Sequence, residues 1–321
     1  MASNNTSMPL LRPAATIALE TATITIISAM IFVCNLGNMR ILKSVTFWHK
    51  STVYLLMNLA VSDICVATFT TSAIFSCITG EYISLFACKI QAFLGGTSVT
   101  VSLITLMLIS VDRYIIIAHP LRHRSLMSNK AIAFMTVLSW TVPVLLYLWV
   151  FWEDILGTQY NPHSFLCSAD LTKHAPFVIV LVAVIFLPAN VTIIYCYGTI
   201  FCIANRHSSN IQSQQAKLNL NKTNPKRNCK AAGMFIVVFG MFNVCWVPYV
   251  ILVIYRVSHP MEQGPHWVNF IIPWMAMSNS FVNIFIYFIL NAQYRTAVKR
   301  LFRCHGRTHS PPEGYTMESN F

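Results

Sequence analysis

Charge is scarce in this sequence. Only 10% of the 321 residues are charged, whereas 55% are hydrophobic. One soluble core of this length cannot hide so much apolar surface, so a soluble protein is excluded and the chain is expected in lipid. The sequence predicts an all-α membrane protein, because lipid offers no partner to a bare backbone group. Seven runs are long enough to cross a bilayer as helices: 21–39, 52–78, 90–110, 131–152, 175–204, 231–255 and 267–292.

Other absences argue against a transporter, a channel and a membrane enzyme, and against a cleaved signal peptide. The apolar runs contain one charged residue, Asp63, and the sequence has no internal repeat. A transporter or channel would need several charges along a path or a repeat, so both are disfavoured. The helices carry neither His-Glu-x-x-His nor a nucleophile–base pair, which argues against a membrane enzyme. The first residues lack the features of a cleaved signal peptide, so the first helix is expected to serve as an uncleaved signal.

The basic residues are unevenly distributed. Eighteen of the 22 Lys and Arg residues fall on one side of the seven crossings, and only Arg12, Lys89, Lys173 and Arg256 fall on the other. The positive-inside rule makes the rich side cytoplasmic, so the N-terminus is expected outside and the C-terminus inside. We expect a multi-pass protein of the plasma membrane. The net charge of +12 is then expected to attract anionic lipid and a cytoplasmic partner, and nucleic acid is not an expected partner.

Each apolar run carries a short marker, and together the markers point to one family. A single marker is weak, because Asp-Arg-Tyr or an isolated Trp occurs by chance. The seven sets are Gly37-Asn38, Leu59 to Asp63, Cys88 with Asp112-Arg113-Tyr114 and His119-Pro120-Leu121, Trp140 with Pro143, Pro188, Phe242 with Cys245 to Pro248, and Asn279-Ser280 with Asn283 to Tyr287. In this order across nearly the whole chain, they resemble the rhodopsin-like (class A) G-protein-coupled receptors.

The resemblance implies a seven-transmembrane helix bundle that catalyses no bond chemistry. An agonist binds outside, and outward movement of the sixth helix activates a heterotrimeric G protein inside. The expected division is an extracellular segment 1–16, the bundle 17–290, an amphipathic eighth helix 291–304 and a disordered tail 305–321. The expected coupling residues are Asp112, Arg113, Tyr114, Leu121 and Tyr287. The expected switch residues are Pro188, Phe242, Trp246 and Pro248, where the prolines break helical hydrogen bonds.

Asp63 matches the sodium pocket of this family. A carboxylate near the bilayer centre costs roughly 2.5–3.5 kcal/mol on insertion scales, so it needs partners or a function. A hard cation such as Na⁺ prefers oxygen ligands. A buried, hydrogen-bonded carboxylate without an ion is the alternative that stays open. The expected network, with Asp63 as the metal ligand and no other cofactor, comprises Asn38, Asp63, Ser102, Trp246, Asn279, Ser280 and Asn283.

Three departures from the family pattern bear on activation. The start of the sixth helix has Asn228 and basic neighbours where many relatives have an acid that clasps the arginine, so a looser resting state is expected. Ile284 replaces the proline of the seventh helix. Tyr195 and Tyr197 stand one residue either side of the usual tyrosine, and the sequence leaves open which of them meets Tyr287.

The expected ligand cavity is apolar and uncharged, which favours a neutral, flat or lipid-like molecule. Gly95 stands where amine receptors have an aspartate, and Met277 where opsins have the retinal lysine. The paired glycines Gly95 and Gly96 are expected to widen the cavity. An amine or peptide receptor of the same class is the alternative. The expected lining is Gln91, Gly95, Gly96, Val99, Thr100, Val180, Val184, Trp246, Tyr249, Val253, Pro273, Trp274 and Met277.

Within the class, the sequence is most similar to melatonin receptors. The likeness rests on Gly157 to Pro162, on Ala92-Phe93-Leu94 with Gly96, on the missing proline and on Cys196-Tyr197. The residues with which those receptors hold their ligand are not matched. Their places are taken by Val150, Val184, Ala169 and Leu171. The resemblance therefore supports the scaffold more than melatonin itself as the ligand.

The resemblance also implies features at the two membrane faces. Cys88 and Cys167 are expected to form a disulfide between the third helix and the second extracellular loop. Asn4 and Asn5 begin glycosylation sequons. Cys304 is a palmitoylation candidate at the end of the eighth helix. The ending Ser319-Asn320-Phe321 fits a PDZ ligand, and arrestin is a further expected cytoplasmic partner.

Overall fold

A computed structural model describes most of the chain. The described ranges are 13–45, 48–80, 84–152, 157–170, 175–218, 226–259 and 264–305, with backbone alone at 204–218, 226–232 and 302–305. The expected glycosylation sites at Asn4 and Asn5, the side chains of Asn228 and Cys304, and the PDZ-like ending lie outside the described parts.

Seven helical spans in these ranges are long and apolar enough to cross a membrane, which confirms the seven expected crossings. Two of them change helix type along their length. The spans are α1 (Ala14–Ser44), α2 (Lys50–Thr79), α3 (Leu85–Ala118), α5 (Asn129–Tyr147) with the 3₁₀ turn η1 (Leu148–Phe151), α6 (Ala175–Val180) with the π-helix η2 (Leu181–Phe186) and α7 (Leu187–Leu218), α8 (Lys226–Ser258), and α9 (His266–Leu290).

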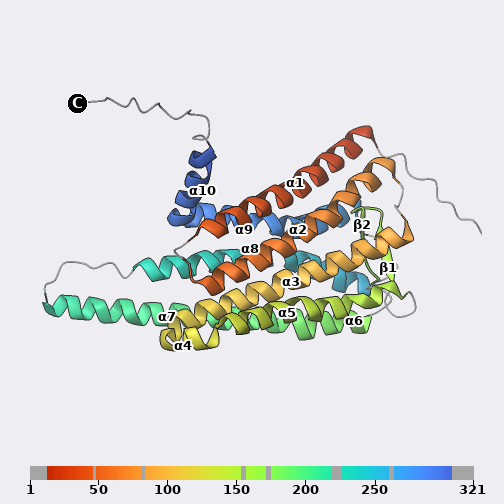
Figure 1. Ribbon diagram of the computed structural model, residues 1–321. Helices are drawn as coiled ribbons and strands as arrows, with labels where there is room; N and C mark the ends of the chain where they lie inside the picture. Colours follow the sequence, from red (N-terminus) through yellow and green to blue (C-terminus); the bar gives the residue numbers. More distant parts are fainter. Residues whose placement is uncertain are drawn as a thin grey trace, which may run out of the picture.

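Four shorter elements complete the described fold. They are α4 (Pro120–Leu126), the strands β1 (Thr158–Asn161) and β2 (Leu166–Ala169), and α10 (Ala292–His305). The strands form an antiparallel hairpin in which Thr158 pairs with Ala169. Figure 1 shows the hairpin at one end of the bundle and α10 turned across the other end. Asn291 begins α10, because its Oδ1 accepts from the backbone N–H groups of Gln293 and Tyr294.

The bundle buries polar residues and exposes apolar ones. In α2, for example, Asn58, Ser62 and Asp63 are buried, whereas Tyr54 and Phe75 are exposed. This distribution is the opposite of a soluble bundle and follows from the solvent, since lipid tails accept apolar side chains and reject polar ones. The polar side chains must therefore satisfy one another inside. α3 occupies the centre and packs against α2, α5, α7 and the hairpin.

The π-helix η2 has an identifiable cause. Pro188 follows it in the second position of α7 and has no N–H to donate. A proline ring also clashes with the carbonyl four residues earlier, which here belongs to Val184 inside η2. Widening the turn to an i→i+5 pattern relieves that clash. The extra residue in the turn changes which side chains of this span face the bundle.

Candidate functional site

A cavity of about 200 Å³ lies inside the bundle beneath the hairpin. Its walls come from α3, η2, α8 and α9, and the hairpin forms its roof. Its lining is mostly apolar. The residues that were expected there and do line it are Gly95, Gly96, Val99, Thr100, Trp246, Tyr249, Val253, Pro273 and Met277. Ligand binding by these residues stays a prediction.

Four residues expected in the lining are not on the cavity wall. Val180 and Val184 are 42% and 65% exposed on the outside of the bundle. The wall is built instead by Val182 and Ile185 among others, because the π-turn shifts the register of this span. Gln91 and Trp274 are buried, but their polar groups hold the hairpin. A regular helical period could not have revealed these differences.

The paired glycines do not widen the cavity. A Cβ on Gly96 would lie 2.0 Å from Cε1 of Tyr147, so the tyrosine ring fills the space beside this glycine. A Cβ on Gly95 would lie 3.4 Å from Cζ of Phe69, an ordinary contact. The absence of a side chain at position 96 thus brings α5 close to α3. The expectation of extra ligand space at this pair is wrong.

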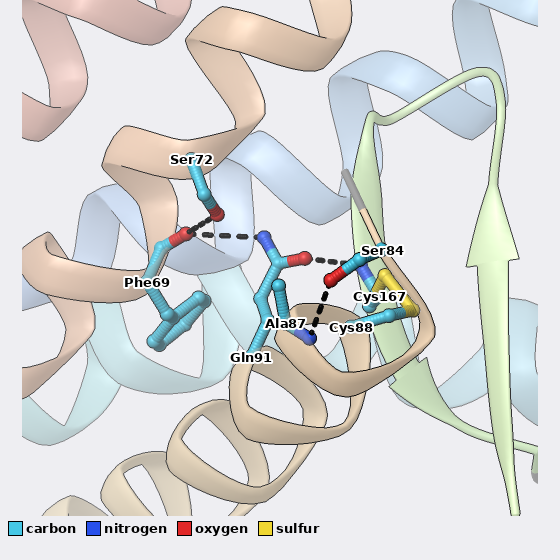
Figure 2. The surroundings of a disulfide bond; sticks show 7 residues. All are labelled: Phe69, Ser72, Ser84, Ala87, Cys88, Gln91 and Cys167. Carbon is cyan, nitrogen blue, oxygen red and sulfur yellow. Dashed lines mark hydrogen bonds between the residues drawn. A yellow bond between two sulfur atoms is a disulfide. The ribbon is translucent and has the colours of Figure 1, made fainter. Parts of the chain in front are cut away.

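The roof is fixed to α3 and α2 around a disulfide. Cys88 of α3 and Cys167 of β2 are joined, as expected from the resemblance. Gln91, one turn further along α3, lies between Phe69 and Cys167 (Figure 2). Its Nε2 donates to the carbonyl oxygen of Phe69 at 3.0 Å, and its Oε1 accepts from the backbone N–H of Cys167 at 3.0 Å. The buried glutamine therefore satisfies one backbone group on each side.

The turn of the hairpin is also attached to α9. Trp274 Nε1 donates to the carbonyl oxygen of Ser164 at 3.0 Å. His163 Nδ1 lies 2.7 Å from Nδ1 of His266, whose Nε2 lies 2.5 Å from Oε1 of Glu20 in α1. Phe165 is 2% exposed and adopts a φ of 60°. Attachments on α3 and α9 together hold the hairpin over the cavity.

The cavity is not uncharged, which corrects the expectation from sequence. Arg256, near the end of α8, contributes to its wall. Its Nη2 donates to Oδ1 of Asn269 in α9. Asn269 is held in turn, because its Nδ2 donates to the carbonyl oxygen of Gly264 at 2.8 Å.

Aromatic side chains follow one face of α8 below Arg256. Phe242 stacks on Trp246 with ring centroids 6.1 Å apart, and Trp246 meets Tyr249 edge to face at 5.7 Å. All three line the cavity. Pro248 lies within this stretch of the helix. A change in what occupies the cavity would therefore press directly on the part of α8 that contains its proline.

The polar network below the cavity centres on Asp63, which is 1% exposed. Ser102 Oγ donates to Oδ1 of Asp63 at 3.2 Å, and the side chains of Ser280 and Asn283 approach the same carboxylate. Asn279 is buried beside them in sequence on α9. The structure thus brings α2, α3 and α9 together at Asp63, as expected.

Asn38 is not part of this network. Its Oδ1 accepts a 2.8 Å hydrogen bond from the hydroxyl of Tyr294 in α10. Near this network α1 is linked to α9 by Asn35, whose Nδ2 donates to the carbonyl oxygen of Ser280 at 2.8 Å. Both asparagines are buried residues of α1. The sequence motif pointed to Asn38, whereas the residue that reaches α9 is Asn35, about one turn earlier.

Asp112, at the end of α3 opposite the hairpin, is fully buried and has three partners. Thr52 Oγ1 donates to its Oδ2 at 2.6 Å, and His123 Nε2 lies 3.0 Å from its Oδ1. The third partner is Arg113, whose Nη2 lies 3.2 Å from Oδ2 of Asp112. The sequence predicted Asp112 and Arg113 as coupling residues, but it did not predict a role for Thr52 or His123. Asp112 consequently connects α3 with α2 and α4.

Arg113 also touches α8. Its guanidinium carbon lies 5.1 Å from the ring centroid of Phe235, within the range of a cation–π contact. Nearby, Ser110 Oγ donates to the hydroxyl of Tyr197 at 3.2 Å. Tyr195 is 62% exposed instead. The structure therefore places Tyr197, and not Tyr195, on the inner side of the bundle, where it acts electrostatically on both Arg113 and Tyr287.

Charges near Asp112 also act on His49, which precedes α2. Partial desolvation lowers the pKa of His49, and electrostatic interaction with His123 and Arg113 lowers that pKa further. The negative charge of Asp112 opposes them. The ring of His49 lies 5.0 Å from that of His123, so the two imidazoles share this corner of the bundle.

Comparison with known proteins identifies the family. Residues 22–287 match the family described as "7 transmembrane receptor (rhodopsin family)". The chain belongs to this family. The receptor has the rhodopsin fold: it superposes on squid rhodopsin with a TM-score of 0.79 at 20% identity, over 94% of its own chain and 89% of that chain. Its family implies a G protein and an extracellular ligand as partners, and no enzymatic activity.

Curated relatives of the receptor have several different ligands in their names. It is 30% identical to the substance-P receptor of Canis lupus familiaris over 94% of its chain and 75% of that protein. It is 29% identical to the melatonin receptor type 1C of Gallus gallus over 90% of its chain and 83% of that protein. It is 28% identical to the tachykinin-like peptides receptor 86C of Drosophila melanogaster over 87% of its chain, which spans 58% of the fly protein.

Motif reasoning missed five residues at the sites of the receptor. Asn35 lies on the buried stripe of α1, where its spacing could have been noticed. Thr52 and Phe235 lie in apolar runs in which other residues formed the markers, and His123 lies in a segment whose charges alone were counted. Arg256 was counted only as an extracellular cation, and the sequence did not show whether its side chain faces the inside of the bundle. Each contact depends on how a helix is rotated, which a single motif does not report.

Proposed function

We propose that the receptor binds a small, largely apolar extracellular ligand in the cavity under the hairpin and activates a heterotrimeric G protein. One observation supports this most directly. α8 lines the cavity with Trp246 at one level and contacts Arg113 through Phe235 about three turns away. A ligand that displaces α8 would therefore also separate Phe235 from Arg113.

The ligand class follows from the size and lining of the cavity. The hairpin is held over the cavity by a disulfide and by Trp274, and a volume of about 200 Å³ is too small for a long peptide. A non-amine small molecule is favoured, because Gly95 offers no carboxylate to a protonated amine. Melatonin-like compounds remain a starting point, since one relative is named as a melatonin receptor. Peptides are the second candidate, because another relative is named for tachykinin-like peptides.

The cytoplasmic partner would dock beside α4. Leu121 is 97% exposed there, which suits a hydrophobic residue that contacts a G protein. Arg113 and Tyr287 both pack against Phe235 of α8 and would be uncovered by movement of that helix. Arrestin would use the same face. We place this face in the cytoplasm of a plasma-membrane receptor, since most Lys and Arg residues belong to it.

Further features at the membrane faces complete the proposal. Glycans on Asn4 and Asn5 would decorate the extracellular N-terminus, and a palmitoyl group on Cys304 would hold α10 at the lipid surface. The basic residues of α10 suit anionic lipid headgroups. The ending Ser319-Asn320-Phe321 would bind a PDZ domain by strand addition.

We also propose that Na⁺ binds at Asp63. The donor set fits a hard cation, since Oδ2 of Asp63, Oδ1 of Asn279 and Oδ1 of Asn283 are buried oxygens without a hydrogen-bond partner among the described residues. The ion would supply a positive charge against the carboxylate. The chain's own contribution is to hold Ser102 and α9 around that charge.

Replacement of Asp63 tests the sodium proposal without an agonist. The melting temperature of the purified receptor in nanodiscs should rise when N-methylglucamine chloride is replaced by NaCl at equal ionic strength. Asp63→Asn should abolish that rise. Asn38→Ala, which removes the contact to Tyr294 outside the network, should retain it. An unchanged sodium response in Asp63→Asn would refute the site.

The receptor function is tested by a G-protein dissociation assay in cells. Neutral indoles, lipids, organic acids and short peptides are screened against the receptor and against mock-transfected cells. An active compound should lose its effect in Arg113→Ala and in Leu121→Ala, with surface expression checked for both. Leu126→Ala, at the other end of α4, serves as the matched control. A response that survives both variants would contradict the proposed coupling face.

A further inference from the structure

Arg256 is the one charged residue among the described side chains that line the cavity. It lies about two turns above Tyr249 and about three turns above Trp246 on the same helix. The cavity therefore has an aromatic, apolar lower part and a cationic upper part. This polarity was not expected from the sequence, where Arg256 served only as a marker of topology.

The guanidinium is held in place but is not neutralised. Its hydrogen-bond partner is the amide of Asn269, a neutral group fixed by Gly264. The ion pairs of the described residues are Arg113 with Asp112, His123 with Asp112, and His266 with Glu20, so none of them includes Arg256. A guanidinium has five N–H donors, and among the described residues Arg256 uses Nη2 for the bond to Asn269, so it has donors left for a ligand of the cavity that it lines.

A partly buried cation beside apolar walls is costly unless an anion accompanies it. The neutral amide of Asn269 orients the guanidinium without compensating its charge. Since the described lining contains a single cation, a monoanion balances it, whereas a phosphate dianion would bring excess charge. The planar fork of arginine matches a carboxylate with two parallel hydrogen bonds.

We propose that the ligand of this cavity is an amphiphilic monocarboxylate whose acid group binds Arg256 and whose apolar body points toward Trp246 and Phe242. This inference rests on the proposed function and adds the chemical class of its ligand. Trp246 and Arg256 are ten positions apart, which corresponds to about 15 Å along the helix, and the arginine side chain takes up part of that length. A medium-chain or aryl-alkyl carboxylate fits that length and the volume of about 200 Å³.

The test compares acids with their uncharged isosteres. Octanoate, decanoate, dodecanoate and 3-indolepropionate are each paired with the primary amide. Binding is measured by the shift in melting temperature of the purified receptor in nanodiscs of neutral lipid, with empty nanodiscs as a blank. At least one acid should bind about tenfold or more tightly than its amide, because truncating one partner of a buried charge pair is strongly unfavourable.

Variants of the cation decide whether Arg256 is responsible. Arg256→Gln should make the acid and its amide bind equally, and Arg256→Lys should retain part of the preference. Lys89→Gln is the matched control, since Lys89 is a cation at the same end of the bundle that donates to the carbonyl oxygen of Phe151 and does not line the cavity. It should leave the preference intact. Folding of each variant is checked by its melting temperature without ligand.

The outcomes separate this inference from the proposed function. Equal binding of acids and amides, a preference that survives Arg256→Gln, or no binding by any acid of the series would overturn the monocarboxylate assignment. A neutral compound that dissociates the G protein equally in the natural protein and in Arg256→Gln would also overturn it and leave the receptor function standing. An acid that binds through Arg256 yet dissociates no G protein would support the inference and refute the function.

Discussion

The guanidinium carbon of Arg113 lies 5.1 Å from the ring centroid of Phe235. This contact joins α3 to α8 at the end of the bundle where many relatives are expected to use an acid. A ring attracts a cation by its quadrupole and needs no charge of its own. Arg113 therefore has a partner on α8 although the acid is missing. This cation–π contact is weaker than an ion pair.

Removal of the ring at position 235 should release α8 more often. Phe235→Leu is expected to raise agonist-independent G-protein dissociation about fivefold, because a cation–π contact contributes about 1 kcal/mol. Phe235→Tyr keeps the ring and should keep the basal signal of the natural protein. Basal dissociation is measured at matched surface expression. A basal signal in Phe235→Leu no higher than in Phe235→Tyr would show that the contact does not restrain α8.

The two glycines of α3 should respond oppositely to alanine. Gly96→Ala is expected to destabilise the receptor by about 1–3 kcal/mol, because its Cβ would overlap the buried ring of Tyr147. Gly95→Ala meets only an ordinary contact and should be neutral or slightly stabilising. Thermal unfolding in nanodiscs measures both. The second change Tyr147→Leu should rescue part of the loss in Gly96→Ala, and equal effects of the two alanines would contradict the packing.

Gln91 should matter more for stability than its position suggests. Gln91→Leu leaves the carbonyl of Phe69 and the N–H of Cys167 without their shared partner, which is expected to cost about 1–3 kcal/mol. Ser72 donates to the same Phe69 carbonyl at 2.6 Å, so Ser72→Ala is the matched control. It should cost less, because Gln91 still satisfies that oxygen. The comparison uses melting temperatures, and a larger loss in Ser72→Ala would reverse the assignment.

His49 should make stability depend on pH. Its pKa in the folded state is lowered, mainly by burial, so the folded state binds fewer protons than the unfolded chain in the window just below a pH of about 6.5. Stability is then lost as the pH falls through that window. His49→Gln should reduce the loss measured between pH 8 and pH 5, whereas His259→Gln, at the opposite end of the bundle, serves as control. An unchanged pH slope in His49→Gln would contradict the lowered pKa.

Much of the fold could be predicted because the relevant physics is local. A run of apolar residues must form a helix in lipid whatever its neighbours are, so the seven spans were visible in the hydropathy of the chain. The pairing of Cys88 with Cys167 came from family resemblance and is present. The convergence on Asp63 was also foreseeable, because a buried carboxylate requires polar partners.

The composition of the walls could not be predicted in the same way. Val180 and Val184 face outward because Pro188 distorts the turn before it, and Tyr147 fills the space beside Gly96 because α5 approaches α3 closely. Asn35 rather than Asn38 reaches α9, because the rotation of α1 decides which of its buried asparagines faces that helix. These outcomes depend on rotations of about 100° per residue and on which helix lies opposite.

The sequence by itself determined that the chain crosses a membrane seven times and which family it resembles. It also determined that the buried carboxylate of Asp63 needs polar partners. Only the tertiary structure decided that Arg256 turns into the cavity, that Phe235 meets Arg113 and that Tyr197 faces inward. Hydropathy is a sum over consecutive residues, so it does not depend on how the helices are arranged. A contact between two helices is a relation between distant segments, and it exists only when both rotations and the gap between the axes allow it.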